Sequence, residues 1–91
     1  MQTIQTLSVE LQLSQDTIIQ ESLKVFLEKK LRETKADIFK IYGKYKVTSV
    51  EALESCFENG SLEEKDALED YHRLDHLEFK RDELSGFLKE L

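Results

Sequence analysis

The 91-residue sequence contains no proline and no tryptophan, and it has only one cysteine and three glycines. Without proline no residue is obliged to interrupt a helix, and so few glycines offer little other reason for a break. The single cysteine, Cys56, cannot form a disulfide within the chain, which favours a reducing compartment and a cytoplasmic location. With no histidine close to it in sequence, Cys56 is expected to be a structural thiol.

Long apolar runs and catalytic motifs are also missing. No stretch approaches the ~20 apolar residues that a membrane span requires, and the first ten residues, MQTIQTLSVE, lack the basic and apolar regions of a signal peptide. Gly43, Gly60 and Gly86 are too scattered to form a phosphate-binding loop. We therefore expect a protein that is not an enzyme, holds no cofactor and does not enter a membrane.

The net charge of −6 is unevenly distributed along the chain. Residues 14–47 hold eight Lys and Arg against five Asp and Glu, whereas residues 48–91 hold five against thirteen. An acidic total disfavours nucleic acid and anionic membranes as partners. Two interpretations remain: the basic and acidic segments neutralise each other inside the fold, or the acidic half binds a basic partner.

The N-terminal segment alternates between apolar and polar residues. Its apolar positions are Leu7, Val9, Leu11 and Leu13. A period of two predicts a β-strand over 7–13, and no second strand is apparent to pair with it. We therefore expect this strand to pair with its own copy across the two-fold axis of a homodimer. The alternative is an extended arm that packs on a helix.

Three later segments have apolar residues at the spacing of a helix, and they predict helices over 15–44, 49–58 and 62–90. Side chains that can cap a helix lie at the three starts: Ser14, Asp16 or Thr17 (the last followed by Gln20) for the first, Thr48 followed by Glu51 for the second, and Ser61 followed by Glu64 for the third. Asn59-Gly60 predicts a left-handed end to the middle helix. The fold class is therefore all-α, a single domain over 1–91 in which a short helix connects the two arms of a long helical hairpin.

The helix predicted over 15–44 is apolar on more than one side in its first half, so more than one side must be covered. This arc and the N-terminal strand together predict the dimer interface, which would join two hairpins into a coiled-coil-like bundle. Its residues are Leu7, Val9, Leu11, Leu13, Ile18, Val25 and Phe26.

His72 and His76 are four residues apart in the last helix, a spacing that can hold a metal ion. With Leu74 facing the core, both rings point roughly away from it, so a solvated helix face is the favoured interpretation and no metal site is predicted.

Asn59-Gly60, then Glu69-Asp70-Tyr71 and Leu74-Asp75-His76-Leu77-Glu78, give the chain a resemblance to a known group over residues 7–91. It resembles small, mostly uncharacterised helical proteins of cyanobacteria and archaea that are regarded as antitoxin-like partners of a neighbouring toxin. The resemblance implies a binding role without catalysis and supplies no active-site residues.

The sequence thus predicts a protein–protein interaction module, the antitoxin of a toxin–antitoxin pair, that neutralises a basic toxin-like partner through its acidic last helix. The partner-binding candidates are Glu69, Asp75, Glu78 and Glu83. Two alternatives are a homodimeric scaffold protein and a metal-binding protein that uses His72 and His76.

Overall fold

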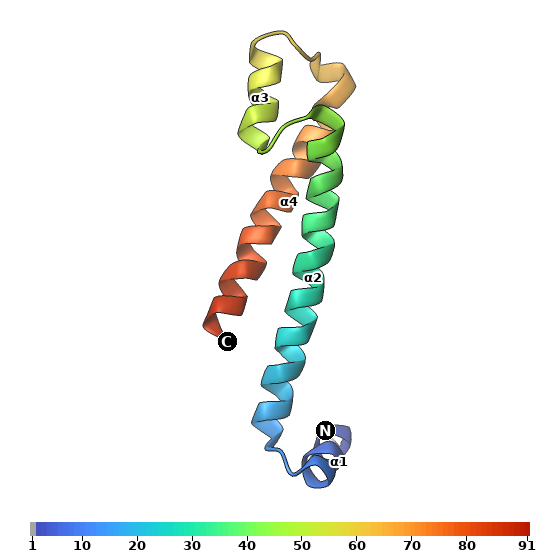
Figure 1. Ribbon diagram of the computed structural model, residues 1–91, viewed down its shortest axis with the longest axis vertical. Coiled ribbons are helices and arrows are strands. Elements are labelled where there is room, and N and C mark those ends of the chain that lie inside the picture. Colours follow the sequence, from blue (N-terminus) through green and yellow to red (C-terminus); the bar gives the residue numbers. More distant parts are fainter. Residues whose placement is uncertain (1) are drawn as a thin grey trace.

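The computed structural model describes residues 2–91, which form four α-helices. They are α1 (Gln2–Leu11), α2 (Gln15–Tyr45), α3 (Val50–Glu58) and α4 (Glu64–Glu90). The two long helices, α2 and α4, lie antiparallel, with α3 at the closed end of the hairpin and α1 against the opposite end of α2 (Figure 1). The molecule is a rod of 62 × 20 × 18 Å. The expected helical hairpin with its short connecting helix is confirmed.

The β-strand predicted over 7–13 is wrong, because Leu7–Leu11 belongs to helix α1 and residues 2–91 contain no strand. Ile4, Leu7 and Leu11 also have helical spacing, so the alternating pattern hid a second periodicity. A lone strand leaves its backbone groups unpaired, whereas a helix satisfies them within the segment. Gln12 then takes a left-handed conformation with φ 56°, and the chain turns into α2. Pairing of strands across a dimer axis is therefore excluded for this segment.

Helix α2 begins and ends close to the bounds predicted for it. Of the three candidates at its start, Ser14 is the cap, since its side-chain oxygen accepts a hydrogen bond of 3.0 Å from the Thr17 backbone N–H. Asp16 and Thr17 lie inside the helix, so the predicted capping box of Thr17 and Gln20 is wrong. The helix continues through Gly43 to Tyr45, and Lys46 ends it in the left-handed conformation with φ 55°.

Helix α3 is capped by Ser49 rather than by Thr48, since the Ser49 hydroxyl accepts from the Ala52 N–H at 3.0 Å. Gly60, with φ 78°, follows α3 in the left-handed conformation that was expected of it. The Leu62 N–H then donates to the Cys56 carbonyl at 3.1 Å, which returns the chain towards α3.

Helix α4 begins at Glu64, two residues later than predicted, and Glu63 precedes it without a capping side-chain hydrogen bond. The predicted capping box of Ser61 and Glu64 is therefore wrong. The Ser61 N–H instead donates to the Asn59 side chain at 2.9 Å. Residues 61–63 are not helical, and Leu62 of this segment packs against the core before the helix starts.

The hydrophobic core lies at the closed end of the hairpin, where α2, α3 and α4 meet. Leu53 of α3 and Leu74 of α4 are fully buried there. The other buried members of this core are Ile38, Ile41, Val47, Val50 and Leu77. Further from α3, Thr34 and Leu84 continue the buried contact between α2 and α4. Packing is therefore dense at one end of the rod and sparse at the other.

None of the four helices within residues 2–91 has both the length and the apolar character that crossing a membrane demands.

Candidate protein-binding surfaces

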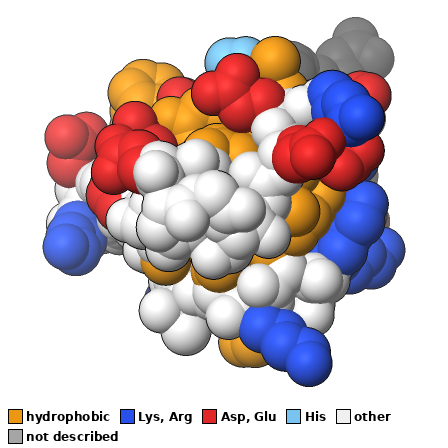
Figure 2. Space-filling model, turned by 90° about the horizontal axis from the view of Figure 1, so that it is seen from above, with side chains coloured by type: hydrophobic (Ala, Val, Ile, Leu, Met, Phe, Trp, Pro, Cys, Tyr) orange, Lys and Arg blue, Asp and Glu red, His pale blue; other side chains and the backbone are white. Residues whose placement is uncertain are grey.

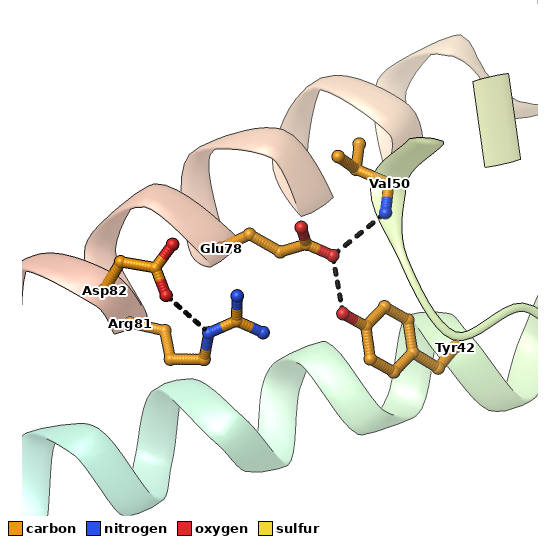
Figure 3. Close-up of polar contacts among 5 residues, drawn as sticks. All are labelled: Tyr42, Val50, Glu78, Arg81 and Asp82. Carbon is orange, nitrogen blue, oxygen red and sulfur yellow. Dashed lines mark hydrogen bonds and ion pairs between the residues drawn. The ribbon is translucent and has the colours of Figure 1, made fainter. Parts of the chain in front are cut away.

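Glu78 of α4, one of the predicted partner-binding residues, points into the junction of three helices (Figure 3). Its carboxylate accepts hydrogen bonds from the Tyr42 hydroxyl at 2.5 Å and from the Val50 backbone N–H at 2.9 Å. Val50 is the first residue of α3, so the carboxylate also lies at the positive end of that helix. Burial first, and then the bond to Glu78, raise the pKa of Tyr42. Glu78 therefore joins the helices to one another and is half-buried.

Asp70 provides a second polar connection between α4 and α2. It accepts hydrogen bonds from the Lys44 ammonium at 2.7 Å and from the Tyr45 hydroxyl. The bond from Lys44, followed by that from Tyr45, lowers the pKa of Asp70. The Tyr42 and Tyr45 hydroxyls, near the C-terminal end of α2, thus both donate hydrogen bonds to carboxylates of α4. Their role is to hold the two long helices together.

Few other charges are neutralised between the two long helices. Among residues 2–91, ion pairs between α2 and α4 are limited to Lys44 with Asp70 and to Arg73 with Asp37, the latter at 4.0 Å. The internal neutralisation considered for the sequence therefore accounts for a small part of the acidic excess. Most carboxylates of α3 and α4 face solvent.

Three of these carboxylates surround an open pocket of about 280 Å³ between α3 and α4. Glu54, Glu58 and Glu64 line it together with Phe57, Leu68 and Tyr71. We call these six residues the acidic pocket. Figure 2, which looks onto this end of the rod, shows acidic side chains interleaved with apolar ones.

The aromatic part of the acidic pocket is formed by one residue from each helix. The rings of Phe57 and Tyr71 meet edge to face with centroids 5.6 Å apart. Burial first, and then the charges of Glu54 and Asp75, raise the pKa of Tyr71. No Lys or Arg within the described chain forms an ion pair with Glu54, Glu58 or Glu64. The pocket therefore combines an apolar wall with uncompensated negative charge.

The remaining partner-binding candidates, Glu69, Asp75 and Glu83, are exposed on α4. Asp75 follows Tyr71 by about one turn and so lies on the side of the acidic pocket, whereas the spacing of Glu69 and Glu83 directs them to other sides. Glu54, Glu58 and Glu64 were not among the binding residues predicted from the sequence. Glu51, Glu54 and Glu58 share one side of the short helix by their spacing, which was the available signal.

The residues predicted for a dimer interface gather at the opposite end of the rod. Val9, Val25 and Phe26 are 79%, 65% and 55% exposed, and Ile18 is half-buried. Leu7, Leu11 and Leu13 are also exposed. The residues of the predicted interface are therefore exposed or half-buried in the single chain. Their contact with a second chain stays a prediction.

His72 and His76 are exposed on α4, and the His72 ring lies against Tyr71 with centroids 5.4 Å apart. Within residues 2–91 no three His, Cys, Asp or Glu side chains come together in a way that could hold a metal ion. Cys56 is a half-buried free thiol that packs against the core.

A family model described as the uncharacterized protein MJ0235 family matches residues 1–91, the whole chain. The chain belongs to this family. No curated protein and no solved structure matches it. Membership of the MJ0235 family confirms the expectation of a small uncharacterised protein, while the antitoxin-like character stays a prediction.

Proposed function

We propose that this protein is a non-enzymatic protein-binding module that holds a basic segment of its partner at the acidic pocket. The observation that carries the proposal is the arrangement of Glu54, Glu58 and Glu64, which have no ion-pair partner, beside the rings of Phe57 and Tyr71. The partner contributes the positive charge that pairs with these three carboxylates.

An arginine or lysine side chain matches both parts of the pocket. Its cationic group pairs with the carboxylates in charge-assisted hydrogen bonds, and its aliphatic stem covers Leu68 and the aromatic rings. A cation over an aromatic face contributes a further ~0.5–2 kcal/mol, depending on how far it is desolvated. Exposed carboxylates such as Asp75 and Glu83 add electrostatic attraction that mainly speeds association.

The resemblance to antitoxin-like proteins favours a toxin-like protein as the partner. The module then covers the basic surface of this toxin and so prevents it from acting. A small growth-inhibiting protein encoded beside this chain is the expected partner, and co-expression of the two should restore growth.

The acidic pocket can be tested directly with a tetra-arginine peptide amide. We expect saturable binding, with backbone amide chemical-shift changes concentrated at the six pocket residues. The triple variant Glu54→Gln, Glu58→Gln, Glu64→Gln should weaken binding about tenfold or more, which corresponds to ~1.4 kcal/mol. The change keeps side-chain size and removes only charge.

The matched control is Glu10→Gln, Glu21→Gln, Glu90→Gln, which removes three exposed charges away from the pocket. Its affinity for the peptide, measured at the same ionic strength, should stay within about twofold of the wild type, because salt screens charges that lie far from the bound peptide. An equal loss in both triple variants would assign binding to overall net charge and overturn the pocket as the site.

A further inference from the structure

The apolar contact surface of α2 does not stop where α4 stops. Thr34, Ile38 and Ile41 of α2 are buried in the hairpin, and Ile19 and Leu23 continue the same helical spacing towards the N-terminus. Leu88 of α4 and Leu91, which follows that helix, line an open pocket with Gln20, Glu21 and Lys24 of α2. The first turns of α2 therefore extend past the end of α4 (Figure 1).

Helix α1 covers this extension only in part. Ile19 and Leu23 remain 42% and 46% exposed. They form an open, apolar pocket of about 340 Å³ with Ile4 and Ser22. Other exposed apolar side chains lie on α1, in the turn after it and on the first turns of α2, and we call the whole set the N-terminal apolar surface. Its members are Leu7, Val9, Leu11, Leu13, Ile19, Leu23, Val25 and Phe26.

The N-terminal apolar surface is also poor in charge. Over residues 2–27 the charged side chains are Glu10, Asp16, Glu21 and Lys24. Nine of the thirteen acidic residues of 48–91 lie between residues 51 and 75, in α3, the turn after it and the first half of α4, towards the opposite end of the rod. Two N-terminal apolar surfaces can therefore approach each other without strong electrostatic opposition.

The exposed area of the chain is larger than a folded monomer of its mass normally has. It is 6953 Å² for 10.7 kDa, against about 5500 Å² for a typical monomer of that size. The excess of roughly 1400 Å² exceeds the ~800 Å² that each partner contributes to a standard interface. Part of the excess follows from the rod shape, but eight of the thirteen large apolar side chains that are exposed among the described residues belong to the N-terminal apolar surface.

We propose that a second copy of this chain occupies the N-terminal apolar surface, related by a two-fold axis that passes near Ile19. The first turns of the two α2 helices lie antiparallel, and each takes the place beyond the end of the other's α4. A two-fold arrangement is favoured because it pairs the same apolar surface on both copies, and such closed dimers are the commonest oligomers. The N-terminus of one α2 also meets the C-terminus of the other α4, where the partial charges of the helix ends are opposite.

This dimer is independent of the proposed function. The acidic pocket lies at the α3 end of each rod, so two-fold pairing through the N-terminal apolar surfaces leaves both pockets free at the outer ends. The dimer is accordingly a long particle with a binding site at each end. Its length should be roughly 100–110 Å, since two rods of 62 Å overlap by their first turns.

Analytical ultracentrifugation between about 1 and 200 µM, combined with small-angle X-ray scattering, tests the proposal. Wild-type protein should reach twice the 10.7 kDa monomer mass and the length given above. Ile19→Lys should weaken dimerisation at least ~100-fold, because the axis places two unpaired charges in an apolar contact. The matched control Phe79→Lys changes a side chain that is 66% exposed on α4 and should leave the dimer unchanged.

A cross-linking variant keeps the test decisive if Ile19→Lys proves poorly folded. With Cys56→Ser as the background, Ile19→Cys treated with copper phenanthroline should give a disulfide-linked dimer, whereas Phe79→Cys should stay monomeric on a denaturing gel. A wild-type monomer at 200 µM overturns the proposal, as does equal dissociation by Phe79→Lys. A compact dimer much shorter than 100 Å would overturn the antiparallel end-to-end arrangement.

Discussion

Glu78 shows how much one side chain can contribute to a small core. Its carboxylate binds the Tyr42 hydroxyl of α2 and the first backbone N–H of α3, so one residue of α4 connects all three helices at the closed end of the hairpin. Hydrogen bonds to a charged acceptor are stronger than those between neutral groups, and partial burial protects them from competition with water.

At the residue scale, Tyr42→Phe should lower the free energy of unfolding by about 1–2 kcal/mol, because the Glu78 carboxylate loses a donor while staying half-buried. Urea unfolding followed by circular dichroism measures the change. The matched control is Tyr71→Phe, in which the removed hydroxyl makes no hydrogen bond within the described chain, so its effect should stay under ~0.5 kcal/mol. Similar losses in both variants would contradict the role given to Glu78.

The elements of this fold depend on where the backbone leaves the helical conformation. Gly60 has φ 78°, a conformation that lets the chain turn from α3 towards α4. Gly86, in contrast, lies within α4, and an added Cβ would meet nothing within 4 Å. Replacement by alanine should therefore change the stability of the protein in opposite directions at these two positions.

At the element scale, Gly60→Ala should destabilise the protein by ~1 kcal/mol, because an L-residue is strained in the left-handed conformation. Gly86→Ala should stabilise it by ~0.5–1 kcal/mol, because alanine restricts the unfolded chain and favours the helix. Thermal unfolding of the two variants beside wild type gives the signs. Stabilisation by Gly60→Ala would show that the turn does not depend on its left-handed conformation, and destabilisation by Gly86→Ala would contradict the open helical site described for Gly86.

The whole molecule is uneven, because its buried residues lie near α3 while the first turns of α2 are largely exposed. A segment with few buried apolar contacts opens at low free-energy cost, whereas core helices open only with the whole fold. The rod should therefore have a stable end, which holds the acidic pocket, and a labile end, which holds the N-terminal apolar surface.

At this scale, native-state hydrogen exchange at concentrations low enough to keep the chain monomeric should show fast exchange over residues 15–23. Amides of α3 and of α4 around Leu53 and Leu74, both fully buried, should exchange most slowly. Protection of residues 15–23 should then rise with protein concentration. Equal protection along α2 in the monomer would contradict the uneven distribution of stability.

The sequence by itself determined the helical hairpin. Apolar residues at helical spacing, the absence of proline and a few strong local signals, such as Ser14 before α2 and Gly60 after α3, act within a few residues of one another. Such local signals fix where a helix forms and, within about two residues, where it begins and ends. They also picked out Val25 and Phe26, which the hairpin leaves exposed.

Only the tertiary structure decided the rest. The segment containing Leu7 and Leu11 fits both a strand and a helix by its pattern, and no strand partner exists within residues 2–91 to favour the strand. Glu78 and Glu58 are both acidic residues in helices, yet one is half-buried in a three-helix junction and the other lines the acidic pocket. The direction in which α3 packs on α4 separates these two roles, and it depends on contacts between residues far apart in sequence.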